Sequence, residues 1–136
     1  MDRPYEIIEH SGDLKLRVFG KTLKDLYLNA ACGLGAALAG KIATNKSSHT
    51  SENVFVESGN SDDLLVDFLN VILYQSDIHN SIFKIKIIEL TEYRVRAEIT
   101  QIAKGPFAIE IKGVTHHGME IRKITEGYST EILFDL

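Results

Sequence analysis

The segment Ile109–Ile121, with the sequence IEIKGVTHHGMEI, alternates apolar and polar residues on each side of a central glycine. Such alternation is typical of β-strands, and His117-Gly118 stands where a tight turn would join two of them. We therefore predict a β-hairpin here. Because successive strand residues point to opposite faces, Glu110 and Lys112 would share one face, about 7 Å apart along the strand.

The length and composition of the chain are typical of one folded domain, which we expect to span residues 1–136. The sequence has 136 residues, of which 44% are hydrophobic and 25% charged, enough for a sizeable core. No apolar run approaches the roughly 20 residues of a membrane-spanning helix, and the first residues lack the apolar segment of a secretory signal. We therefore expect a soluble, cytoplasmic protein.

The net charge of the chain indicates whether it can bind nucleic acid directly. A formal charge of -4 and a pI near 5.7 argue against a large basic surface for RNA phosphates. We expect any RNA involved to be held by another protein. The single cysteine, Cys32, excludes an internal disulfide and a cysteine-rich zinc site. We predict that it is a small buried hydrophobic residue.

The first predicted helix begins after Gly20. Thr22, followed three residues later by Asp25, forms an approximate capping box. Gly33 and Gly35 each weaken a helix by about 1 kcal/mol relative to alanine, which favours close packing at these positions or an end near Gly40. One apolar stripe follows from the spacing of three and four residues between Leu23, Leu26, Tyr27, Ala30, Ala31, Leu34 and Leu38.

The second helix is predicted to begin at Ser61. Its hydroxyl would cap the helix, and acidic residues in the first turn would interact favourably with the helix dipole. Asp67 and Asn70 would lie off the core face, in solvent, and Asp77–Ser81 would form a loop. The apolar face would consist of Leu64, Leu65, Phe68, Leu69, Ile72 and Leu73.

Roughly eight strands are predicted around these two helices. The connections between consecutive strands are too short for parallel crossovers. The predicted fold class is therefore α+β, with a mostly antiparallel sheet, or two, and both helices packed against it. Besides the two arms of the hairpin, the expected strands lie near residues 5–9, 14–19, 54–56, 83–88, 93–100 and 128–135.

The last two residues carry two carboxyl groups, the side chain of Asp135 and the terminal carboxylate of Leu136. Clustered like charges require a cation. If the fold brings Asp13 beside them, three carboxylates converge, and such a set suits calcium or magnesium and not zinc. The alternative is that the chain end is solvated, as most chain ends are.

Other polar residues allow two interpretations each. Lys112 is either a solvated charge or an ammonium group near the carboxylates that can face a partner's phosphate. His10 either stabilises a turn or orients Asp13 from outside the first ligand shell. His116 and His117 would project to opposite faces of a strand, so at most one of them lies near a site.

The sequence contains no motif that defines an enzyme. It has no glycine-rich phosphate loop, no serine elbow, no His-Glu-x-x-His box and no cysteine-centred nucleophile set.

Five segments in register resemble the archease family. They are Ile8–Asp13, Gly20–Ala31, Asp63–Asn70, Ile109–Ile121 and Ile132–Leu136. The resemblance implies an archease-like fold and a non-catalytic protein cofactor of the tRNA-splicing RNA ligase. Such a cofactor promotes guanylylation and multiple turnover of the ligase in tRNA splicing or RNA repair.

The resemblance also implies the roles of particular residues. The family's metal ligands fall on Asp13, Asp135 and Leu136, and its lysine important for activity falls on Lys112. The implied cofactor is a divalent ion, calcium first, with magnesium or manganese as alternatives. The sequence departs from the family pattern at Ser11-Gly12, Gly113 and His116, and the last of these weakens any role assigned to His116.

Two other functions remain open at this point. One is a stand-alone metal-dependent hydrolase of phosphoesters, and the other is a chaperone-like binding module without metal. The resemblance leaves the oligomeric state open.

Overall fold

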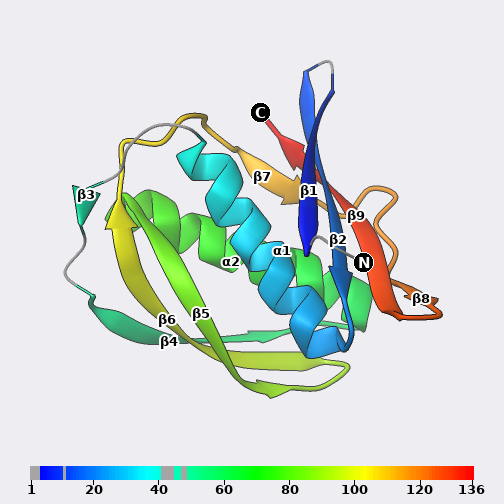
Figure 1. Ribbon diagram of the computed structural model, residues 1–136. Helices are drawn as coiled ribbons and strands as arrows, with labels where there is room; N and C mark the ends of the chain where they lie inside the picture. The colour runs from blue at the N-terminus through cyan, green and yellow to red at the C-terminus, as the bar shows by residue number, and fades with distance from the viewer. Residues whose placement is uncertain (1–3, 11, 41–44, 47–48) are drawn as a thin grey trace.

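The computed structural model describes residues 4–10, 12–40, 45–46 and 49–136, and these residues form two antiparallel sheets and two helices (Figure 1). The predicted α+β class is confirmed. Of the sheet arrangements that the sequence allows, two sheets are observed. The elements are β1 (Tyr5–His10), β2 (Asp13–Gly20), α1 (Leu23–Ala39), β3 (Asn45–Lys46), β4 (Ser51–Glu57), α2 (Ser61–His79), β5 (Ser81–Leu90), β6 (Arg94–Lys104), β7 (Gly113–Thr115), β8 (Arg122–Ile124) and β9 (Gly127–Asp135).

The first sheet is built on the pairing of β2 with β9. Its order is β1-β2-β9-β7, and β8 also pairs with β9. The β1–β2 hairpin turns at Gly12, whose φ of 78° lies in the left-handed region that glycine adopts without strain. The hairpin projects from the molecule beside the C-terminus (Figure 1).

The predicted hairpin between residues 109 and 121 is wrong. β7 pairs with residues 133–135 of β9, and β8 pairs with residues 127–129. Both pairings are antiparallel, so β7 and β8 run in the same direction along one edge of β9. Residues 116–121 interrupt this edge opposite residues 130–132. A turn does occur at Gly118 (φ 68°), but alternation does not specify a strand's partner, and the long edge of β9 accepts both short strands.

The second sheet has β6 at its centre. β5 covers one edge of β6, while β3 and β4 lie in line along the other edge. Inward-facing residues of β6 are buried because both helices contact this strand or its neighbour β5. The outward-facing residues remain exposed or half-buried, as expected for an antiparallel sheet with one wet face.

Helix α1 begins as predicted. The hydroxyl of Thr22 accepts a hydrogen bond from the backbone N–H of Asp25 at 3.1 Å. The close packing expected at Gly33 is also observed, because a Cβ there would lie 2.7 Å from the methyl groups of Leu16 on β2. Gly40 (φ 54°) ends the helix by donating its N–H to the carbonyl of Ala36.

Helix α2 is capped by Asn60 and not by the predicted Ser61. The Asn60 side chain accepts from the backbone N–H of Asp63 at 2.8 Å, and the Asn60 carbonyl accepts from Leu64. The predicted loop at Asp77–Ser81 is also wrong. The helix continues to His79, and Asn80 ends it in the left-handed conformation, with its backbone N–H donating to the carbonyl of Ser76.

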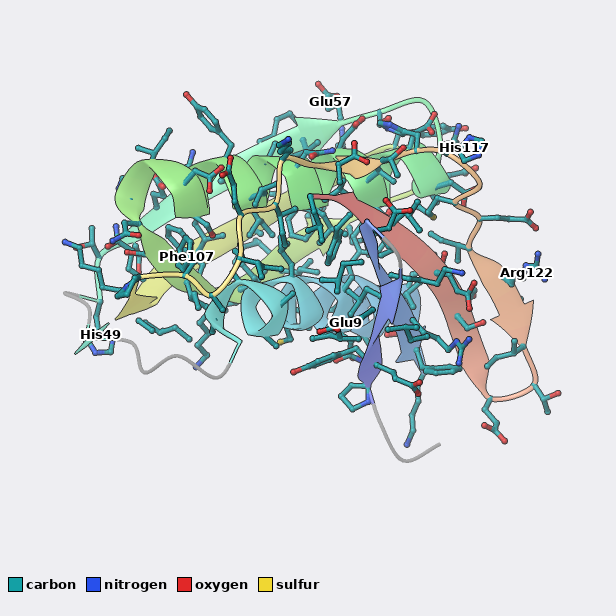
Figure 2. The ribbon with its side chains drawn as sticks, turned by 90° about the horizontal axis from the view of Figure 1, so that it is seen from above. Glu9, His49, Glu57, Phe107, His117 and Arg122 are labelled. Atoms are coloured by element: carbon teal, nitrogen blue, oxygen red, sulfur yellow. The ribbon has the colours of Figure 1, made fainter. Side chains whose placement is uncertain are left out.

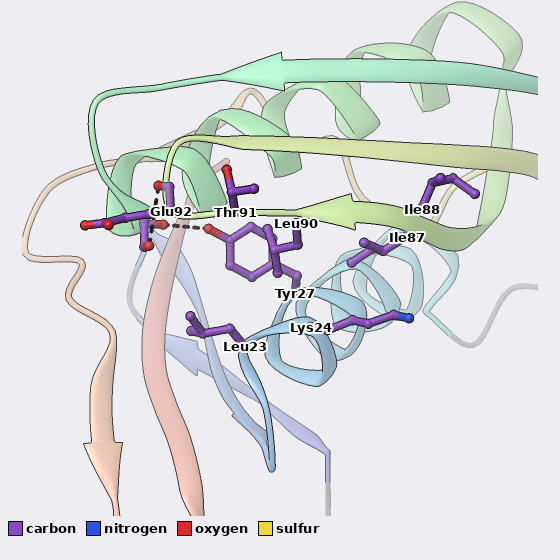
Figure 3. Close-up of a pocket in the computed structure, with 9 residues that line it drawn as sticks. Leu23, Lys24, Tyr27, Ile87, Ile88, Leu90, Thr91 and Glu92 are labelled. Carbon is purple, nitrogen blue, oxygen red and sulfur yellow. Dashed lines mark hydrogen bonds between the residues drawn. The ribbon is translucent and has the colours of Figure 1, made fainter.

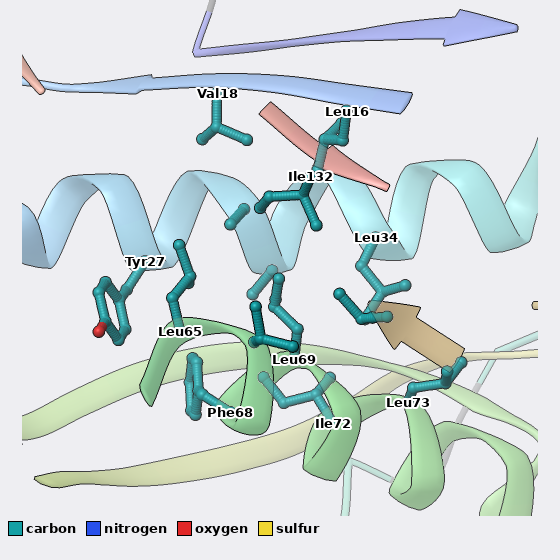
Figure 4. Packing of buried hydrophobic residues seen from close by; sticks show 14 of the residues in the cluster. Leu16, Val18, Tyr27, Leu34, Leu65, Phe68, Leu69, Ile72, Leu73 and Ile132 are labelled. Atoms are coloured by element: carbon teal, nitrogen blue, oxygen red, sulfur yellow. The ribbon is translucent and has the colours of Figure 1, made fainter. Parts of the chain in front are cut away.

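The hydrophobic core is formed by the inward-facing side chains of both sheets and both helices. Figure 4 shows side chains of the first sheet packing onto α1 and those of α2 packing beneath it. Burial of this apolar surface is the main force that holds the layers together. The largest fully buried side chains are Tyr27, Phe68, Phe134, Leu16, Leu26, Leu34, Leu38, Leu64, Leu65, Leu69, Ile99 and Ile132.

Cys32 does not have the predicted buried position. Its side chain is exposed on α1, because Cys32 lies outside the apolar stripe to which the buried residues Ala30, Ala31 and Leu34 belong. Neither helix in the described part of the chain is long and apolar enough to cross a membrane.

Candidate functional site

The structure brings Asp13 and Asp135 together from opposite ends of the chain. Asp13 is the first residue of β2, Asp135 is the last residue of β9, and the two are direct cross-strand neighbours in the antiparallel register. Directly opposite residues have their Cβ atoms about 4.5–5.5 Å apart and point to the same face. Two carboxylates are therefore adjacent at one end of the first sheet.

Leu136 lies at the same end of the sheet. It follows Asp135 in the chain, and it lines a pocket of about 440 Å³ together with Asp13. The terminal carboxylate and the two aspartates therefore belong to one region of the surface. All three groups offer oxygen atoms, the donor type that calcium and magnesium prefer.

The charge environment of this pair differs from that of the neighbouring carboxylate on β9. Glu131 contacts Arg17 at 3.0 Å and Lys15 at 3.5 Å, and the hydrogen bond from Arg17 lowers the pKa of Glu131. Among the side chains that the structure describes, which do not include that of His10, no basic group lies within 4 Å of Asp13 or Asp135. Like charges directly opposite each other destabilise a sheet, so a divalent cation fits this position.

The protein supplies only part of a coordination shell. Within the described ranges, no three His, Cys, Asp or Glu side chains are grouped so that they could hold a metal. A cation at this position would therefore have at most Asp13, Asp135 and the carboxylate of Leu136 as ligands from the described residues. Because calcium takes six to eight oxygen ligands, the remaining positions would be open to water or to groups of a partner.

Lys112 contacts Asp135 through the backbone. Its N–H donates to the Asp135 carbonyl at 2.7 Å, one residue before β7 begins. The Lys112 side chain is exposed, and in the part of the chain that the structure describes no carboxylate lies within 4 Å of its ammonium group. The Lys112 ammonium is thus exposed and without an ion pair among the described residues, and its backbone lies one residue from Gly113, the strand partner of Asp135.

Comparison with known proteins identifies the family. Residues 5–136 match the model of the "Archease protein family (MTH1598/TM1083)". The chain belongs to the archease family. A relative called "Protein archease" from Methanosarcina acetivorans is 31% identical, over 98% of this chain and 97% of its own length. Its counterpart from Methanopyrus kandleri is 28% identical, over 98% and 99%.

Two solved structures share this archease fold. One is the solution structure of protein 1598 from Methanobacterium thermoautotrophicum, with a TM-score of 0.73, 20% identity, and coverage of 98% of this chain and 99% of that one. The other is the crystal structure of an "archease, possible chaperone" from Thermotoga maritima, with a TM-score of 0.67, 17% identity and 96% coverage of both chains.

In this archease-family chain, helix α2 holds the segment that follows Lys112. Asn70 donates to the Val114 carbonyl and accepts from the Val114 N–H, both at 2.9 Å. Asp62 accepts from the N–H of Ile121 at 2.9 Å. The prediction that Asn70 lies in solvent is therefore wrong. A helical pattern shows which residues leave the core face, but not that an edge strand lies against them.

The predicted histidines have separate positions. Nε2 of His116 lies 3.1 Å from a carboxylate oxygen of Asp67, which is thus not simply solvated. His116 is three residues past Gly113, the partner of Asp135, and so roughly 10 Å away by strand rise. It is therefore directed to α2 and away from the carboxylate pair.

His117 is exposed (Figure 2) and its N–H donates to the Thr115 hydroxyl. The backbone of His10 pairs with that of Asp13, but the His10 side chain and Ser11 lie outside the described residues.

A second pocket, of about 310 Å³, lies between α1 and β5 and is lined by none of the predicted site residues (Figure 3). The buried hydroxyl of Tyr27 donates to the Ser61 carbonyl at 2.7 Å beside it. Burial, followed by the charge of Asp62, raises the pKa of Tyr27. The phenol therefore stays neutral and joins the start of α2 to α1, which is a structural role.

Proposed function

We propose that this chain is a non-catalytic, calcium-binding activator of a tRNA-splicing RNA ligase. The proposal assigns the cation to the carboxylates of Asp13, Asp135 and Leu136, and a partner-directed charge to Lys112. In this role the protein promotes guanylylation and multiple turnover of the ligase in tRNA splicing or RNA repair. Magnesium or manganese are the alternative ions, and RNA is contacted only through the ligase.

One observation carries the proposal: Asp13 and Asp135 are opposite each other in the register of β2 and β9. Two carboxylates directly opposite each other cost stability unless a cation joins them. Membership of the archease family supports the choice of partner. A bound ion would keep open coordination positions, and the ammonium of Lys112 carries a positive charge. Both can bind phosphate oxygens in the ligase's nucleotide site.

The test is a multiple-turnover ligation assay with purified ligase and an RNA whose ends are a 2′,3′-cyclic phosphate and a 5′-hydroxyl. The wild-type protein with calcium should raise turnover, and Asp13→Asn should abolish this effect. Asp25→Asn is a matched control. It makes the same change in the first turn of α1, at a residue that is not among the proposed metal ligands, and it should behave as wild type. Lys112→Ala should keep calcium binding but lose activation.

The same assay without the ligase tests the rival function. Hydrolysis of a phosphoester by the protein alone, lost in Asp13→Asn, would identify a metal-dependent hydrolase and contradict the activator proposal. Activation that persists in Asp13→Asn would contradict the role of the cation.

A further inference from the structure

The pocket beside Asp13 and Leu136 combines an apolar interior with an acidic rim. Its volume is about 440 Å³, and it lies between β1, the last turn of α1 and the segment before β7. The charged residues Glu9 and Asp13, which we call its rim, line the pocket together with Leu136. Its apolar lining, which we call its interior, consists of Ile7, Leu14, Ala36, Ala37, Ala108 and Ile109.

Glu9 has no evident role in holding the fold. It is exposed on β1, and its cross-strand neighbour is Leu14. No cation lies within 4 Å of its carboxylate in the described part of the chain, and it is not among the proposed metal ligands. Its negative charge lines an apolar pocket, where it can interact with a positive group from outside.

The edge of β1 provides a further means of recognition. Among the described strands, β1 pairs only with β2. Its other edge presents unpaired backbone groups next to Ile7 and Glu9, which line the pocket. An extended segment can hydrogen-bond to such an edge while its alternate side chains enter the adjacent pocket.

We propose that this pocket receives an extended segment of the ligase that carries an apolar side chain next to a lysine or arginine. The inference rests on the proposed function. The apolar side chain would fill the interior, and the cation would face Glu9, which is not among the proposed calcium ligands, since complementary charges favour encounter and fix register. A second copy of this chain is a poorer occupant, because each copy carries a net charge of -4.

Two variants test the pocket without touching the proposed metal ligands. Ala36→Leu enlarges a half-buried residue of α1 that lines this pocket and also a separate one between α1 and the start of β5, at a position where leucine is a good helix former. Glu9→Gln removes the rim charge. Glu57→Gln is the matched control, because Glu57 is an exposed glutamate on β4 of the other sheet (Figure 2).

The measurement is calorimetric titration of the ligase into each variant at saturating calcium, with calcium titrated into each variant alone. Ala36→Leu should weaken ligase binding roughly tenfold or more, as filling an anchor pocket does. Glu9→Gln should weaken it less and reduce its dependence on salt. Glu57→Gln should bind as wild type, and Ala36→Leu should bind calcium as wild type.

The outcomes separate this inference from the proposed function. If wild-type protein with calcium fails to bind or activate the ligase, both are wrong. If the wild type binds and both pocket variants bind equally well, the pocket proposal alone is overturned. A wild-type dimer in sedimentation that Ala36→Leu dissociates, with ligase affinity unchanged, would assign the pocket to a second copy and also overturn it.

Discussion

At the scale of single residues, Asn70 joins helix α2 to the edge of the first sheet. Its amide bonds to both backbone groups of the buried residue Val114. Asn70→Leu keeps the size of the side chain but leaves a donor and an acceptor unpaired. The free energy of unfolding should fall by about 2–4 kcal/mol, measured by urea denaturation. Asp67→Asn, at an exposed contact with His116, should change it by less than about 1 kcal/mol.

A loss below about 1 kcal/mol in Asn70→Leu would indicate that water replaces the amide at Val114.

Gly33 permits the close approach of α1 to β2. In Gly33→Ala the new methyl group would lie 2.7 Å from the fully buried Leu16, and overpacking of this kind costs about 1–3 kcal/mol. The gain of about 1 kcal/mol in helix propensity should not offset it fully, so the melting temperature should fall. Gly35→Ala is the comparison, since its nearest contact is a methyl of Ile82 at 3.1 Å.

Gly35→Ala should melt at or above the wild-type temperature. Equal behaviour of the two alanine variants would show that Leu16 has room to move, and would contradict the packing argument.

At the scale of elements, the pairing of β2 with β9 includes a pH-dependent contact. The hydrogen bond from Arg17 lowers the pKa of Glu131. A lowered carboxyl pKa adds stability above the pKa of an unfolded glutamate, about 4.3, and that stability is lost as the pH falls through the folded-state value. Because both side chains are over 40% exposed, the contribution should stay below about 1 kcal/mol.

Arg17→Met should therefore melt slightly below wild type at pH 7 and at the same temperature near pH 2. Its Glu131 carboxyl should also titrate at a higher pH by NMR. A difference in melting temperature that persists at low pH would assign the effect to lost packing of the arginine side chain.

Elements with local causes could be predicted from the sequence. The cap at Thr22 and the apolar stripes of both helices depend on residues three or four positions apart, so the pattern contains the information. The segment at 109–121 could not be predicted in this way. Its alternation and the turn at Gly118 are local, but the choice of β9 as partner depends on a strand that comes later in the chain.

At the scale of the whole molecule, the candidate site joins the two ends of the polypeptide. Spacing suggested a carboxylate cluster at Asp135 and Leu136, but no local pattern could show that Asp13 lies opposite. That proximity follows from the eight-residue register of β2 with β9. The contacts of Asn70 and Asp62 were missed for a related reason, since their partners lie on a distant segment.

A cation bound between the chain ends should stabilise the entire fold. At a free calcium concentration 100 times Kd, the free energy of unfolding should rise by about 2.7 kcal/mol. Asp135→Asn should remove this rise, and in the absence of metal it should be slightly more stable than wild type, because the repulsion opposite Asp13 is relieved. Chemical denaturation with calcium and with a chelator measures both effects.

A calcium effect that survives in Asp135→Asn would place the ion elsewhere.

The break between β7 and β8 has a consequence for behaviour at high concentration. A long straight strand at the border of a sheet can recruit another molecule and start aggregation. Here one border of the first sheet consists of two three-residue strands separated by a loop, so a neighbouring molecule finds no continuous ladder to extend. We expect this side of the molecule to resist fibril growth even when the protein is crowded.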